Sequence, residues 1–264
     1  MNLNEIINRE LPVIDIANFE RIADIGTSKG VQTKWYGSGL FVKKEYLGYE
    51  SVAETVTSFL LSFSNLLPEE YVIYRQCQIQ QGSQVIGKGC FSRDFRKPGE
   101  IFIPFGRLLK MHNKPLDCDK AILEEVISRY ISCEELDRYL NVVFSLDTII
   151  LNEDRHVFNL GLVNSGKAYK PAPIFDNGFS LLSDIMEFLI ELPNKENMEK
   201  VKAKPFDKDF LINRGDKPVI LELDYESLME NIPNEIEDPA FARAVSVLKE
   251  RLTEMENKVW RKKG

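Results

Sequence analysis

The apolar pattern of this chain changes character near residue 90, and this change restricts the possible folds more than any other feature. Before it, short apolar runs bounded by Gly, Ser, Asn or Pro predict strands, with one amphipathic helix among them. After residue 100, apolar residues recur mainly at helical spacing. Segregated strands and helices are typical of an α+β fold rather than of a doubly wound parallel sheet. The predicted strands span residues 40–44, 71–79 and 84–91, and the predicted helices span residues 51–63, 119–130, 134–151, 225–231 and 239–260.

This segregation predicts two lobes. We expect a small strand-rich lobe over residues 1–91 and a larger helical lobe over residues 92–264. A pair of short strands interrupts the helical lobe, at residues 160–163 and 172–174, around the turn NSGK. A chain of 264 residues can bury the core of such a structure without crosslinks.

Composition argues against several classes of protein. The net charge of −7 disfavours a nucleic-acid binder, which usually carries a basic face. The four cysteines form no CxxC pair and the chain has two histidines, so the usual ligand spacing of a structural zinc site is absent from the sequence. No apolar run is long enough to span a bilayer, and the N-terminal residues lack the apolar segment of a signal peptide. We therefore expect a reduced, cytoplasmic protein without direct contact to membranes or nucleic acids.

Polar residues with metal-binding side chains surround the predicted strand pair. The stretch LNEDRHVFNLGL places Asp154 and Asn159 before the first strand, and PAPIFDNGFSLL places Asp176 directly after the second. Because loops at the ends of rigid elements commonly carry function, we expect these side chains to form one site. Carboxylate and amide oxygens are hard ligands that suit Mg²⁺ together with nucleotide phosphates.

The spacing matches a phosphoryl-transfer site. In protein kinases a catalytic-loop Asp accepts the proton of the acceptor hydroxyl, an Asn five residues later binds metal, and a further Asp before a Gly binds metal from the other side. Asp154, Asn159 and Asp176 have this arrangement. Lys43, at the end of a predicted strand, could contact phosphates, and Glu54, in the following helix, could pair with it.

A weaker pattern lies upstream of Lys43. In GTSKGVQTKW, the residues Ser28 and Gly30 could belong to a loop that holds the nucleotide phosphates. The loop lacks the full GxGxxG pattern, so it is weak evidence taken alone. A hydroxyl there, at Thr27 or Ser28, is also a candidate for phosphorylation of the chain by itself.

The motifs DRHxxN and IFDxG, at residues 154–159 and 174–178, resemble those of the HipA-like serine/threonine kinases of bacteria, including the CtkA type. The helix before them, FSLDTIILNEDRH, is similar to that family, and KGVQTKW, LFVKK and VAET resemble its N-terminal lobe more loosely. The resemblance implies a bilobal protein-kinase-like fold that uses ATP with Mg²⁺ or Mn²⁺. It also implies a catalytic loop at residues 152–159, a metal-binding motif at residues 174–178, a protein acceptor with a Ser or Thr hydroxyl, and a candidate antitoxin-like partner.

Alternatives remain open at this level. Lys44 is adjacent to Lys43, and strand alternation sends the two to opposite faces without saying which faces the site. We expect Arg155 and His156 to hold the loop rather than to react. The phosphoinositide kinases share similar motifs, so the chain could act on a lipid or small alcohol, or bind nucleotide as a pseudokinase without transfer.

Overall fold

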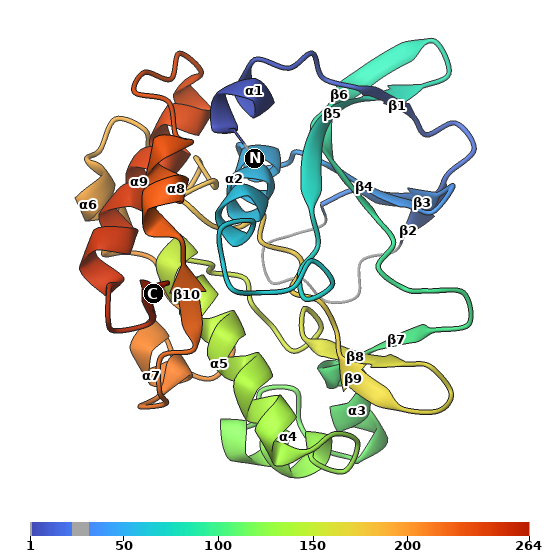
Figure 1. Cartoon of the computed structure of the whole chain (residues 1–264). Coiled ribbons are helices and arrows are strands. Elements are labelled where there is room, and N and C mark those ends of the chain that lie inside the picture. Colours follow the sequence, from blue (N-terminus) through green and yellow to red (C-terminus); the bar gives the residue numbers. More distant parts are fainter. Residues whose placement is uncertain (1, 23–31, 264) are drawn as a thin grey trace.

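The computed structural model describes residues 2–22 and 32–263 and contains a six-stranded sheet beside a group of helices (Figure 1). The strand order is β1-β5-β6-β4-β3-β2, with β1 parallel to β5 and the other neighbours antiparallel. The predicted α+β combination of a strand-rich sheet with separate helices is thus confirmed. The strands are β1 (Val13–Asp15), β2 (Glu20–Ile22), β3 (Lys34–Gly37), β4 (Leu40–Lys44), β5 (Tyr74–Gln81) and β6 (Gln84–Arg93).

Helix α2 (Glu50–Leu61) lies between this sheet and the C-terminal helices (Figure 1). All of its residues are buried, although the sequence predicted a single apolar face. Two of its hydroxyl groups bind β5: Tyr74 N donates to Ser58 Oγ at 2.9 Å and Gln76 Nε2 donates to Ser51 Oγ at 2.9 Å. These hydrogen bonds attach α2 to β5. They fix the position of Glu54 on the side of α2 that contacts Lys43.

The long helix α5 (Cys133–Ile150) forms the centre of the helical part. A capping box between Ser132 and Glu135 starts it, which satisfies otherwise free backbone donors. It ends at Leu151, whose φ of 55° is left-handed, and this turn releases the chain into the loop at residues 152–159. The surrounding helices are α1 (Leu3–Ile7), α3 (Phe105–Met111), α4 (Lys120–Ile127), α6 (Asn194–Met198), α7 (Phe210–Arg214), α8 (Tyr225–Glu230) and α9 (Pro239–Met255).

A small three-stranded sheet lies between the loop at residues 152–159 and the turn at Asp176 in the sequence. It contains β7 (Ile101–Pro104), β8 (Gly161–Asn164) and β9 (Tyr169–Pro171). The second strand of the hairpin was predicted at residues 172–174 and lies instead at Tyr169–Pro171. Gly166, at φ 79°, closes a tight turn, so pairing resumes at once between Asn164 and Tyr169. Two further strands, β10 (Leu221–Leu223) and β11 (Trp260–Lys262), form a separate parallel pair.

The described part of the chain bears on two expectations, the absence of a membrane-spanning segment and the reduced state of the cysteines. Within it, we find no helix long and apolar enough to cross a bilayer. The four cysteines are all unpaired, with Cys77, Cys90 and Cys118 buried and Cys133 exposed. The core is accordingly held by packing, to which α2, α5 and α9 contribute more residues than the other elements.

Candidate active site

Lys43 is the lysine of the pair that faces the interior. Its Nζ lies 2.6 Å from Glu54 Oε1 and 2.7 Å from Asp176 Oδ1, and it lies 4.5 Å from the centre of the Tyr74 ring. Both Lys43 and Glu54 are almost fully buried. The two carboxylates outweigh the cost of burial and raise the pKa of Lys43 well above its usual value. The ammonium group therefore stays charged and links β4, α2 and the turn at Asp176.

Asp176 sits at a backbone position that is unusual for a residue with a side chain. Its φ is 60°, so the turn is left-handed and directs the carboxylate toward the sheet. There it meets Lys43 and also Lys34, whose Nζ is 3.3 Å from Oδ2. Burial alone would favour the neutral acid, but Lys34 and Lys43 hold the pKa of Asp176 well below its usual range. Asp176 is thus a permanently ionised carboxylate at physiological pH.

Glu54 fixes the turn that follows Asp176 as well as Lys43. Its Oε2 accepts a hydrogen bond from the backbone N–H of Asn177 at 3.0 Å. A Cβ built on the next residue, Gly178, would lie 3.3 Å from Glu50 Cβ, so α2 and this turn are packed closely together. The Glu54 carboxylate therefore holds both Lys43 and the backbone beside Asp176. The close packing of α2 against this turn explains why glycine suits position 178.

The buried side chain of Arg155 links the loop at residues 152–159 to the turn at residues 175–177. Its side chain is fully buried and donates to both oxygens of Asp147 at 2.9 Å. It also donates at 2.7 Å to the carbonyl of Phe175 and at 2.7 Å to Asn177 Oδ1. This agrees with the expectation that Arg155 is structural. Asp147 was not predicted as part of the site, although an acid inside the apolar helical run SLDTII is a signal of a buried partner.

Asp154 and Asn159 are joined directly within the loop. Asn159 Nδ2 donates to the carbonyl of Asp154 at 3.2 Å, and Asn152 Oδ1 accepts from the N–H of Asp154 at 3.1 Å. The carboxylate of Asp154 meets Lys204, whose Nζ lies 3.2 Å from Oδ1. Lys204 and Lys34 were not predicted as site residues. Both lie far along the chain from the acids that they contact; Lys34 belongs to the stretch KGVQTKW, whereas the segment around Lys204 carries no recognisable motif.

The described residues at the site offer oxygen ligands suited to a divalent cation. Asp176 supplies an ionised carboxylate, and because Nδ2 of Asn159 binds the Asp154 carbonyl, Oδ1 of Asn159 remains for a ligand. A second group of carboxylates, Glu153, Asp184 and Glu187, has oxygens within 4.8 Å of one another. These acids have other partners in the structure, and acids commonly gather in this way without an ion.

His156 is buried beside this site with one nitrogen unpaired. Its Nδ1 accepts from the N–H of Phe158 at 3.2 Å, whereas Nε2 has no hydrogen-bond partner. Burial lowers the pKa of His156, and this effect exceeds the opposing influence of Asp154 and Asp176. The imidazole ring of His156 is therefore neutral at pH 7 and packs within the loop, in line with a structural role.

A pH dependence of stability follows from His156. Below about pH 6.5 the unfolded chain takes up a proton that the folded ring resists, so the free energy of unfolding falls as the pH is lowered. In His156→Asn, whose amide oxygen can replace Nδ1 as acceptor, this part of the pH dependence should disappear. Urea unfolding of both proteins at pH 7.5, 6.5 and 5.5, without added metal, measures it. Parallel curves for the two proteins would show that His156 does not contribute.

Two predicted residues cannot be placed. Ser28 and Gly30, proposed for a phosphate-binding loop, lie outside the described residues, as does Thr27. Their roles stay predictions. The described neighbour of that loop, Lys34, already reaches Asp176.

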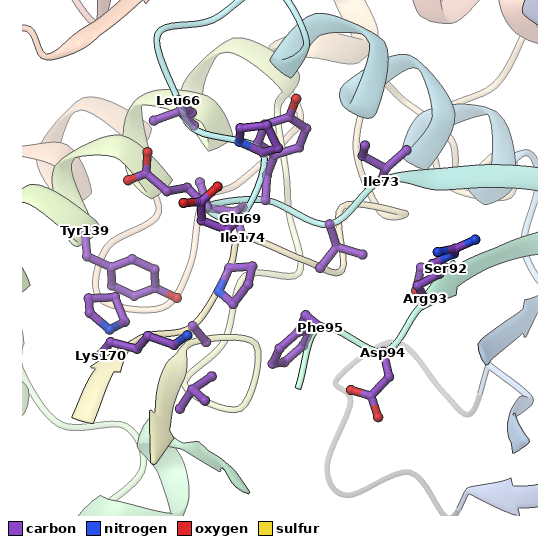
Figure 2. A pocket seen from close by; sticks show the side chains of 18 of the residues that line it. Leu66, Glu69, Ile73, Ser92, Arg93, Asp94, Phe95, Tyr139, Lys170 and Ile174 are labelled. Carbon is purple, nitrogen blue, oxygen red and sulfur yellow. The ribbon is translucent and has the colours of Figure 1, made fainter. Parts of the chain in front are cut away.

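A cavity of about 1200 Å³ is lined in part by Ile174, from the segment that precedes Asp176 (Figure 2). Residues of the α2–β5 connection, the end of β6 and α5 line it, among them Leu66, Ile73, Phe95 and Tyr139. Lys43, Glu54, Asp154, Asn159 and Asp176 are not among its lining residues. The candidate active site is therefore defined by its charged side chains and not by this hollow.

Comparison with known proteins supports the fold. No protein-family model matches the sequence, and no curated protein matches it. The crystal structure of the proinflammatory kinase CtkA of Helicobacter pylori is similar, with a TM-score of 0.62 and 17% identical residues over 92% of this chain and 95% of that chain. HipA of Shewanella oneidensis, in its complex with HipB and operator DNA, gives a TM-score of 0.48 at 11% identity, over 95% of this chain and 69% of that chain. The similarity to CtkA confirms, at the level of the fold, the resemblance to kinases of the CtkA type.

Proposed function

We propose that this chain is a kinase that transfers the γ-phosphoryl group of ATP to a serine or threonine hydroxyl of a protein. The observation that supports this most strongly is the buried contact of Lys43 Nζ with Glu54 and Asp176, at 2.6 and 2.7 Å. In protein kinases a lysine paired with a helix acid and an acid that binds metal must both be in place for phosphoryl transfer. The kinase-like fold supports the same conclusion.

In this proposal the nucleotide lies between the two lobes, residues 1–91 and residues 92–264. Lys43, held by Glu54, binds phosphate oxygens, and Ser28 and Gly30 contribute from the preceding loop. Asn159 and Asp176 hold Mg²⁺ or Mn²⁺, which neutralises charge on the phosphates when bound. Without nucleotide, Lys34 and Lys43 supply the positive charge that Asp176 faces.

Asp154 acts as the general base. It accepts the proton of the acceptor hydroxyl as the oxygen bonds to the γ-phosphorus and the bond to the β-phosphate breaks. The loop that presents it is rigid, because Arg155 and Asn152 tie it to Asp147 on α5. Catalysis by such a site depends on positioning and charge neutralisation rather than on covalent chemistry of the protein.

A panel of acceptors tests the proposed substrate class. The wild-type protein is incubated with labelled ATP and Mg²⁺ or Mn²⁺, together with a basic protein, inositol-lipid vesicles or a sugar. We expect label on the protein acceptor or on the chain itself. Label confined to the lipid or the sugar would replace the protein acceptor by that class, and nucleotide binding without any transfer would indicate a pseudokinase.

Asp176→Asn tests the metal-binding role. The variant should lower turnover by about 100-fold or more, because an amide neither neutralises Lys43 nor binds the metal as a carboxylate does. It should also weaken the dependence of nucleotide binding on Mg²⁺, measured by calorimetry with and without the ion. Asp117→Asn, which changes an exposed carboxylate in the same way, is the matched control. Turnover and Mg²⁺ dependence at the wild-type level in Asp176→Asn would contradict the role.

A further inference from the structure

The loop that carries Asp154 provides no positive charge of its own at the reacting groups. Arg155 is fully buried and bound to Asp147, Phe175 and Asn177. His156 stays neutral because burial lowers its pKa. Lys34 and Lys43 both contact Asp176, on the side of the proposed metal ligands. Among the described residues, none of these four side chains presents a positive charge to the acceptor side, where negative charge would develop.

Lys204 is placed at that side by a remote segment of the chain. It lies between α6 and α7 and its Nζ is 3.2 Å from Asp154 Oδ1. Its neighbours fix the segment: Phe206 packs edge-on against Phe144 of α5, with ring centres 5.9 Å apart. Asn213 Oδ1 accepts from the N–H groups of Phe206 and Asp207 at 3.2 and 2.8 Å. The position of Lys204 is thus determined by packing against the helical core.

A purely stabilising role does not account for this contact. The Lys204 side chain is 34% exposed, and ion pairs that reach solvent contribute only about 0–1 kcal/mol. The contact instead places a cation where the hydroxyl, the base and the phosphoryl group must meet.

We propose that Lys204 is a catalytic residue whose ammonium group binds the transferring phosphoryl group. The inference rests on the function proposed above. Asp154 must lie within hydrogen-bond distance of the attacking hydroxyl, about 3 Å, so Lys204 lies beside the oxygens of the phosphoryl group under attack. The hydroxyl proton goes to Asp154, and ADP leaves with the electron pair of the broken P–O bond. Lys204 keeps its protons, forms no covalent bond and stabilises negative charge in the transition state.

Three variants of the full chain test this role. Lys204→Met removes the charge at similar length, Lys204→Arg keeps the charge, and Lys202→Met removes an exposed lysine of the same segment. Lys204→Met should lower kcat by about 100-fold, the effect of losing one transition-state contact, with KM for ATP within about 3-fold of wild type. Lys204→Arg should recover at least a tenth of the wild-type kcat, and Lys202→Met should match wild type. Calorimetric binding of ATP to each variant shows that the site is folded.

The outcomes separate this inference from the proposed function. An active wild type with an equally active Lys204→Met variant would overturn the role of Lys204 alone. A variant faster than wild type would also overturn it and would show that Lys204 obstructs the base. A proportional loss of kcat and ATP binding in both Lys204 variants would mean that the residue only supports the fold. A wild type that transfers no phosphate to any acceptor would overturn the proposed function, and the role of Lys204 with it.

Discussion

If Asp154 is the general base of the proposed reaction, replacing it by Asn should lower the rate of phosphoryl transfer by about 1000-fold, within the range that a general base contributes. The amide has nearly the shape of the carboxylate but cannot accept the hydroxyl proton at neutral pH. Nucleotide binding should change little, because Lys43, Glu54 and Asp176 are untouched. The measurement is kcat against the best acceptor, with ATP affinity determined by calorimetry on the same preparation.

The control for Asp154→Asn is the exposed Asp117→Asn, which should keep the wild-type rate. The melting temperature of Asp154→Asn should remain close to that of wild type, because the Asp154–Lys204 pair reaches solvent and contributes little. A variant that retains more than a tenth of the wild-type kcat would remove Asp154 from the role of base.

Replacing Arg155 by Met should lower the free energy of unfolding by about 3–5 kcal/mol, the cost of breaking a buried ion pair. The substitution leaves the Asp147 carboxylate buried without its guanidinium partner, and it also removes the donors to Phe175 and Asn177. Urea unfolding at pH 7 measures the change. Arg107→Met, at an exposed position, should shift the free energy by less than about 0.5 kcal/mol.

A double variant tests the cause of that loss. Combining Arg155→Met with Asp147→Leu removes both charges, so the double variant should be more stable than Arg155→Met alone. If the double variant is instead destabilised by the sum of the two single losses, the ion pair is not the source of the effect. A loss below about 1 kcal/mol in Arg155→Met would contradict the scaffold role described here.

Local pattern was sufficient to predict the elements that carry the candidate site. The strand with Lys43, the helix with Glu54 and the helix before Asp154 all form near the predicted ranges. Their apolar residues recur at the period of the element, and this signal lies within one short window. Lys43 and Glu54, predicted as a pair, do lie in contact. The spacing of Asp154 and Asn159 likewise corresponds to a direct contact within one loop.

Contacts between distant segments could not be predicted from pattern. Lys34 and Asp176 are separated by 142 residues, and Lys204 and Asp154 by 50. No periodicity relates such positions, because the packing of whole elements brings them together. Strand alternation could not decide between Lys43 and Lys44, since the choice depends on which face α2 covers. The short strands β1 and β2 were also missed, because three residues each carry too little pattern and pairing with neighbours defines them.

The central claim is that the site around Lys43, Asp154 and Asp176 transfers the γ-phosphoryl group of ATP. The most direct test is incubation of the wild-type protein with γ-labelled ATP and Mg²⁺ or Mn²⁺, beside Asp154→Asn, with label read on the chain and on a basic protein acceptor. We predict label with wild type and none with the variant. Nucleotide binding by the wild type without label on any acceptor, or equal label with both proteins, would contradict the account.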